Sequence, residues 1–189
     1  MARLREFEIG EALDGVMGVF WRQGYDGASM QDIEAATGLN KQSLYRIFPD
    51  KRAMYLAALE RFEAIEFEKA EDVLTAPGTA QARFEALFGG VIAQAAQGDR
   101  RGCFLCNAAA DQGQEDEEAT AIVSASMGRL EKMFRKALTI SAPYNRDRKA
   151  CEERAAALLS TYLGLRILTK ADAPLRVIKA AASAAIKAI

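Results

Sequence analysis

The chain has 189 residues, half of them hydrophobic, and its 25 basic and 26 acidic side chains leave a formal net charge of −1. This length can bury a sizeable core, while the near-neutral charge does not by itself indicate a nucleic-acid partner. The absence of histidine excludes histidine-based acid–base and nucleophile chemistry, and three cysteines fit a reducing compartment better than a disulfide framework.

Apolar residues recur at three- and four-residue steps along most of the chain, and no run shows the alternating β-branched pattern of strands. This pattern predicts an all-α fold of about nine helices, the first over about 7–24. The opening MARLREFEIGE interleaves charges and is no signal peptide, and no apolar run approaches the ~20 residues that span a bilayer. We therefore expect a soluble, cytoplasmic protein.

The segment Ser29 to Lys51 carries the signals of two short helices. Ser29 and Asp32 form a variant capping box, so a helix begins after Ser29, and Gly38 ends it. Asn40 caps a second helix, which stops before Pro49. Two short helices joined by a tight glycine turn predict a helix-turn-helix, in which the second helix enters a DNA major groove.

Side chains of this second helix divide by spacing. We expect Leu44, Ile47 and Phe48 to face inward, because a helix this short must be held by its neighbours. Donor-rich residues lie on the other side, and basic residues gather near the segment, namely Arg3, Arg5, Lys41, Arg46, Lys51 and Arg52. The even overall charge counts slightly against DNA binding unless the acidic residues lie on other faces.

The remaining sequence predicts six further helices. A long one opens at Lys51, and breaks follow at 76–79, 98–102, 112–118, 141–147 and 172–174. We predict a helix-turn-helix DNA-binding domain over 1–50 and a helical ligand-binding and dimerisation domain over 51–189. The last two helices have more apolar surface than one partner needs, which favours a dimer built as a four-helix bundle. The alternative is that they only cover their own core.

The residues around the helix-turn-helix resemble the TetR-type (tetracycline-repressor) family of transcriptional regulators. The resemblance is tightest over residues 12–62 and rests on the pieces VFWRQGYDGASMQDIEAATGL and NKQSLYRIFPDKRAMYLAAL. A weaker match is RGCFLCNAAADQ, similar to a Gly-Cys-x-x-x-Asn element of one branch. One departure is Ile47, where many members carry a polar residue or histidine.

The resemblance implies a homodimer whose two reader helices contact a near-palindromic DNA operator, with half-sites about one DNA turn (~34 Å) apart or somewhat more. It also implies a C-terminal pocket whose small-molecule ligand releases the DNA. We adopt repression as the hypothesis, and no cofactor is implied.

By motif position, Tyr45 and Lys51 resemble the family's phosphate contacts, and Ser29 is a third candidate at a helix start. The first turn of the reader helix is expected to contact the base edges, because Lys41 can bind guanine and Gln42 can bind adenine. Arg46 is a phosphate or base contact, or a solvated charge. The predicted DNA-binding set is Ser29, Lys41, Gln42, Ser43, Tyr45, Arg46 and Lys51.

Aromatic and Met side chains of the middle helices, with one amide, are candidates for the ligand pocket, although such stripes are more often core. They are Phe62, Phe84, Phe88, Phe104, Asn107, Met127, Phe134 and Tyr162. Cys103 and Cys106 lie on the same face of a helix. They could act as a thiol redox switch, or they could be small apolar side chains that fill the core. We expect no metal site, because Cys151 is the only other thiol.

Two other classes of protein compete with this interpretation. An enzyme is disfavoured, because no nucleophile–base pair or phosphate-binding loop is present and the acidic pair Glu117 and Glu118 lies in a solvated run. A helical protein-interaction module without sequence-specific DNA binding is the more serious alternative, given the acidic balance and Ile47.

Overall fold

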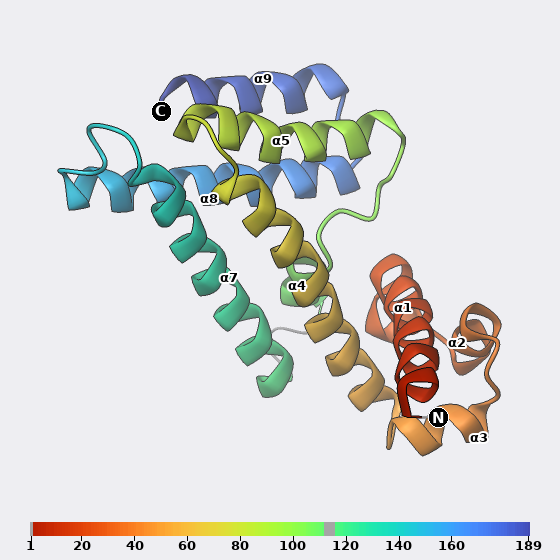
Figure 1. Ribbon diagram of the computed structural model, residues 1–189. Coiled ribbons are helices and arrows are strands. Elements are labelled where there is room, and N and C mark those ends of the chain that lie inside the picture. Colours follow the sequence, from red (N-terminus) through yellow and green to blue (C-terminus); the bar gives the residue numbers. More distant parts are fainter. Residues whose placement is uncertain (1, 112–115) are drawn as a thin grey trace. The chain divides into compact units, whose positions relative to one another are not determined.

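The computed structural model describes residues 2–111 and 116–189, with side chains from residue 9 onward in those ranges, so Arg3 and Arg5 contribute only backbone. The described residues form nine α-helices and no strand, which confirms the predicted all-α fold (Figure 1). None of these helices is long and apolar enough to cross a membrane. They are α1 (Ala2–Gly27), α2 (Met30–Thr37), α3 (Lys41–Ile47), α4 (Lys51–Thr75), α5 (Ala80–Ala96), α6 (Phe104–Asp111), α7 (Glu117–Leu138), α8 (Arg148–Lys170) and α9 (Leu175–Lys187).

The chain divides into two compact units, each built from two separate stretches of sequence. Unit 1 takes residues 1–65 and 104–123, and unit 2 takes residues 66–103 and 124–189. The helices α4 and α7 each give one end to each unit. The unit that contains the helix-turn-helix thus includes more than residues 1–50, and the functional boundary predicted there stays a prediction.

Local capping explains the ends of α2 and α3. The Ser29 hydroxyl accepts from the Asp32 backbone N–H at 3.1 Å, and the Asp32 carboxylate accepts from the Ser29 backbone N–H at 3.1 Å, which completes the predicted capping box. Gly38 ends α2 with a φ of 69°, a left-handed conformation that glycine adopts without strain. Asn40 caps α3 by accepting from the Ser43 N–H at 2.9 Å.

The core of unit 1 is aromatic. Phe20 of α1 is fully buried, and its ring centre lies 5.2 Å from that of Tyr55 in an edge-on contact. Phe104 of α6 packs edge-on against Tyr55 and Phe62 at 5.7 and 5.8 Å. The first helix runs from Ala2 to Gly27, longer than predicted, but Gly24 has a non-helical φ of 72°, so the expected break is present.

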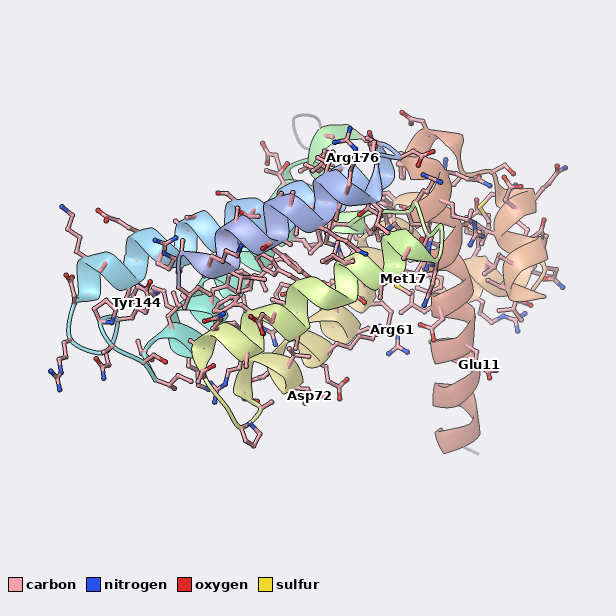
Figure 2. All side chains as sticks on the ribbon, turned by 90° about the horizontal axis from the view of Figure 1, so that it is seen from above. Glu11, Met17, Arg61, Asp72, Tyr144 and Arg176 are labelled. Carbon is pink, nitrogen blue, oxygen red and sulfur yellow. The ribbon has the colours of Figure 1, made fainter. Side chains whose placement is uncertain are left out.

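Two further contacts hold α1 in place within unit 1. Arg61 of α4, labelled in Figure 2, donates to the Asp14 carboxylate at 2.8 and 3.2 Å. Gly15 lies so close to α2 that an added Cβ would stand 3.0 Å from the Ala36 carbonyl oxygen. The helix-turn-helix is therefore packed directly on α1.

In unit 2, α5, α8 and α9 lie side by side (Figure 1). The buried stripe of α9 consists of Ile178, Ala182 and Ile186, at the spacing of one helix face. Tyr144, labelled in Figure 2 on the loop between α7 and α8, donates its hydroxyl to the carbonyl oxygens of Ala188 and Ile189 at 3.4 and 3.3 Å. This loop thereby contacts the C-terminal end of the chain.

Candidate nucleic-acid interface

The short helix α3 is anchored along one side. Leu44 is fully buried and Phe48 is 8% exposed, as their spacing predicted. The Glu34 carboxylate of α2 also accepts from the Lys41 backbone N–H. A seven-residue helix has little stability of its own, so these contacts and the Asn40 cap hold its orientation.

The other side of α3 faces solvent. Lys41, Gln42, Tyr45 and Arg46 are exposed, and Ser43 is half-buried. The Lys41 ammonium stands 5.7 Å from the centre of the Tyr45 ring, so the two side chains form one surface. Lys and Gln can donate to base edges, and Tyr and Arg can donate to phosphate. The predicted reader residues therefore come from one exposed face of an anchored helix.

Two flanking helix starts carry the remaining predicted contacts. Lys51 opens α4, and its ammonium lies 4.6 Å from the centre of the Tyr25 ring. Asp50 caps α4 by accepting from the Ala53 N–H at 2.7 Å. The Ser29 hydroxyl donates to Asp32 at 2.6 Å, so a phosphate contact from this hydroxyl requires it to leave the carboxylate. Lys51 is therefore better placed than Ser29 to contact a phosphate.

Arg52, the neighbouring cation, is engaged by carboxylates. Its Nε and Nη2 donate to Asp116 at 2.7 and 2.8 Å, and Nη2 also lies 3.0 Å from a Glu118 oxygen. These hydrogen bonds from Arg52, with one from the Ala119 backbone N–H, hold the pKa of the Asp116 carboxyl down to about 2. Two carboxylates thus offset the charge of Arg52.

An open cleft of about 790 Å³ lies beside α3 within unit 1. Ser43, Arg46 and Ile47 line it from α3, together with residues of α1, α2 and the turn after it. Ile47 was expected to face inward, but it is half-buried because it borders this cleft. The aliphatic side chain offers no hydrogen bond there, so the polar contacts of α3 come from its first turn and Arg46.

Most of the predicted pocket residues form aromatic core. In unit 2, Phe134 lies 5.1 Å from Phe84 and 5.8 Å from Tyr162, and Phe88 lies 5.9 Å from Tyr162. Met127 is half-buried. The other three candidates, Phe62, Phe104 and Asn107, are buried in unit 1. Their role as ligand contacts stays a prediction.

Tyr162 also lines a cavity of about 150 Å³ within unit 2. Charged residues that sequence reasoning missed lie beside it, namely Glu66, Lys69 and Arg166. Arg166 is only 4% exposed although it is charged. A signal was present, because Arg166 interrupts an otherwise apolar run, LGLRIL, on the buried side of α8.

Of the three cysteines, Cys103 and Cys151 are buried and Cys106 is half-buried. Burial raises the pKa of the Cys151 thiol, which opposes formation of a reactive thiolate. Among the residues that the structure describes, no group of three or more Cys, Asp or Glu side chains is arranged to hold a metal ion. Redox sensing by Cys103 and Cys106 stays a prediction.

Comparison with known proteins points to one family. Residues 12–58 match the family model of bacterial regulatory proteins, tetR family. The uncharacterized HTH-type transcriptional regulator YezE of Bacillus subtilis is 29% identical over 135 residues, which cover 71% of this chain and 70% of that protein. The HTH-type transcriptional repressor ComR of Escherichia coli is 37% identical over 60 residues, 32% of this chain and 29% of that protein.

The likeness also extends over the fold. The TetR family transcriptional regulator CifR, a cysteine mutant solved with a 26-base-pair double-strand operator DNA, superposes with a TM-score of 0.79. The two chains are 25% identical, and the superposition covers 95% of each. The sequence match falls on the helix-turn-helix described above, with its anchored α3 and exposed first turn. Residues 12–58 therefore match the DNA-binding region of the tetR family of bacterial regulatory proteins, and the fold of nearly the whole chain is similar to that of a TetR family transcriptional regulator.

Proposed function

We propose that the protein is a ligand-responsive repressor in the cytoplasm that binds a near-palindromic DNA operator as a homodimer. The observation that carries the proposal is the solvent-facing first turn of α3, with Lys41 and Gln42, on a helix that Leu44 and Phe48 anchor. Tyr45 and Lys51 supply phosphate contacts, which fix the register of the reader helix but carry no sequence information. No catalytic role is assigned to any residue.

The proposed dimer forms through α8 and α9. Ile167, in the last turn of α8, is 57% exposed and offers a large apolar side chain to a partner. The small exposed residues Ala156, Ser160 and Ala184 on the same two helices leave room for close approach. Two-fold pairing of such faces would bring together two reader helices, as a palindromic operator requires.

The comparisons support operator binding and repression without fixing the target. The CifR structure contains operator DNA, and the Escherichia coli relative is described as a repressor. The proposed signal for release of DNA is a small molecule bound in unit 2. Packed helices can convert a small displacement at a binding site into a switch between two distinct arrangements of an interface. Loss of half-site spacing would weaken both reader helices together.

A mobility-shift titration against the DNA upstream of the protein's own gene tests the proposal at two salt concentrations. Retention of this DNA over a shuffled sequence of the same length at moderate salt supports the regulator. A double variant, Gln42→Ala with Lys51→Ala, serves as the negative control. Absence of retention at either salt concentration favours the helical interaction module instead.

Repression is tested separately in cells. Transcripts next to the gene should rise when the gene is deleted and fall when it is restored. Restoring the Gln42→Ala, Lys51→Ala variant should leave them high. A fall on deletion would identify an activator.

A further inference from the structure

The cavity of about 150 Å³ in unit 2 is lined by both apolar and charged side chains. Its apolar walls come from Ala70 and Val73 of α4 and from Leu87 and Val91 of α5. Arg166 of α8 reaches its edge and is 4% exposed. Burying a guanidinium carries a large desolvation cost, and an apolar residue of similar volume is often as stable in such a position. Stability of the fold is therefore a weak reason for an arginine at this position.

The guanidinium takes part in a buried network. Its Nη1 donates to the Tyr162 hydroxyl at 2.9 Å, and its Nη2 donates to a Glu66 oxygen at 3.0 Å and to the Gly102 carbonyl oxygen at 3.4 Å. The other Glu66 oxygen accepts from the Lys69 ammonium at 3.0 Å. The Glu66 carboxylate thus lies between two cations that line the cavity, the buried Arg166 and the largely exposed Lys69.

Three charged side chains line the cavity. Glu66 contributes −1 and Arg166 contributes +1, and Lys69, whose side chain is 68% exposed, adds +1, so these three lining residues together carry +1. Burial alone raises the pKa of Glu66, but Arg166 and Lys69 outweigh it and hold that pKa below its ordinary value, so Glu66 is ionised at neutral pH. A further cation is repelled by this set, whereas a single anion neutralises it.

The size and lining of the cavity limit the anion further. A volume of about 150 Å³ has room for a small organic molecule. The apolar residues of α4 and α5 favour an apolar body, and the guanidinium Nη2 can donate a charge-assisted hydrogen bond to a carboxylate. The lining therefore selects for a short molecule with one charged end.

We propose that this cavity binds a small organic monocarboxylate, with its carboxylate on Arg166 and its apolar part against α4 and α5. The inference rests on the proposed function, since this ligand is the signal that releases DNA. The incoming carboxylate replaces Glu66 as acceptor of the Arg166 Nη2 hydrogen bond. Glu66 belongs to α4, which opens with Lys51, so ligand binding alters a contact of the helix that follows the reader helix.

Isothermal titration calorimetry with a fixed set of probes tests the ligand class. Butyrate, hexanoate and benzoate are compared with uncharged benzamide and cationic benzylamine. At least one carboxylate should bind, with benzamide at least about tenfold weaker and benzylamine without measurable heat. Equal binding of benzoate and benzamide, or no heat from any carboxylate, overturns the proposal.

Two charge variants predict opposite changes for the best carboxylate. Arg166→Gln should weaken binding at least about tenfold, because the charge-assisted hydrogen bonds are lost. Glu66→Gln should strengthen binding several-fold, because the competing acceptor loses its charge. Weaker binding in Glu66→Gln contradicts the exchange, and this second variant decides the matter if Arg166→Gln does not fold.

A pair of neighbouring glycines supplies a steric test that leaves the charges in place. Gly90 lines the cavity and Gly89 does not, and an added Cβ at either position meets no atom within 4 Å. Gly90→Leu should abolish carboxylate binding by filling the cavity, while Gly89→Leu should bind as the wild type does. Equal binding by the two variants would place the ligand elsewhere.

The same preparations are assayed for operator retention with and without the best carboxylate. Carboxylate binding with release of DNA supports both proposals. Carboxylate binding by a protein that retains no operator preserves the cavity assignment but removes the regulator. Operator retention without carboxylate binding removes only the cavity assignment, and retention that the bound carboxylate does not change removes its role as the release signal.

Discussion

The ammonium of Lys51 lies 4.6 Å from the centre of the Tyr25 ring at the start of α4. A ring face attracts a cation without neutralising its charge, so the contact orients Lys51 and leaves its positive charge available to a phosphate. We predict that Lys51→Ala weakens binding to operator and shuffled DNA alike. The slope of log affinity against log salt concentration should fall in magnitude by about one.

The matched control is Lys149→Ala, at the start of α8 in unit 2, where the lysine side chain is 85% exposed. This change removes the same charge from a residue outside the predicted interface, and its salt slope should equal that of the wild type. An unchanged slope in Lys51→Ala would remove Lys51 from the phosphate contacts.

Gln42 and Tyr45 should separate base reading from phosphate binding on the same exposed face of α3. Gln42→Ala is expected to weaken operator binding by about 1–3 kcal/mol with little effect on shuffled DNA, because a bidentate contact to a base discriminates by that amount. Tyr45→Phe keeps the ring beside Lys41 and should weaken both DNAs equally. Fluorescence anisotropy with the two DNAs measures the ratio, and a uniform loss in Gln42→Ala would contradict base reading.

Gly15 should tolerate no side chain. A Cβ there would stand 3.0 Å from both the Ala36 carbonyl oxygen and the Thr37 γ-methyl, so Gly15→Ala must push α2 away from α1. We expect a loss of about 1–2 kcal/mol in unfolding free energy by urea denaturation, despite the better helix propensity of alanine. Gly128→Ala in α7, where the Cβ meets nothing within 4 Å, should instead be neutral or stabilising by up to about 1 kcal/mol.

The Arg52–Asp116 pair predicts a pH dependence in acid. The pKa of Asp116 lies at about 2 in the folded protein, below its ordinary value near 4, so the pair stabilises the fold fully above about pH 4. This contribution is lost as the pH falls toward 2. Arg52→Gln should raise the Asp116 pKa toward its ordinary value, which a carboxyl ¹³C titration measures. The difference in unfolding free energy between the Arg52→Gln variant and the wild type should become smaller as the pH drops.

Glu118→Gln is the control for that titration, because it removes the second carboxylate near Arg52 and keeps the two hydrogen bonds to Asp116. Its Asp116 pKa should stay close to 2. A value that stays low in Arg52→Gln would assign the shift to the backbone N–H donors of α7 alone.

Ile167 and Ile140 are two exposed isoleucines, at 57% and 46%, and they test the proposed dimer face. Ile167→Asp places a charge on the exposed face of α8 and should yield monomers in size-exclusion chromatography with light scattering. Ile140→Asp, just beyond α7, should leave the dimer intact. A dimeric Ile167→Asp protein would move the interface away from this part of α8.

The helix ends were predictable because their causes are local. The caps at Ser29 and Asn40 depend on side chains within three residues of the N–H groups from which they accept, and both occur in the structure. The predicted exposure of Lys41 and Gln42 follows from the same short-range periodicity. Contacts with DNA depend on a partner, so those assignments stay predictions.

Pairings between distant segments were beyond sequence reasoning. Arg52 meets Asp116 across 64 residues and Glu66 meets Arg166 across 100, and no local pattern relates such positions. The edge-on contacts of Phe104 with Tyr55 and Phe62 in unit 1 were likewise not predicted from its aromatic character. Periodicity indicates that a side chain is buried, but the element that covers it depends on the tertiary fold.

The interrupted make-up of unit 1 limits how this protein can be recombined with its relatives. A chimera joined at residue 65 would take Tyr55 and Phe62 from one parent and Phe104 from the other, so an inherited aromatic cluster would be split. To exchange the whole of unit 1, a chimera needs two further junctions, one on each side of residues 104–123. Specificity can therefore be transplanted most safely by grafting the exposed positions of α3 alone, leaving both parental cores undisturbed.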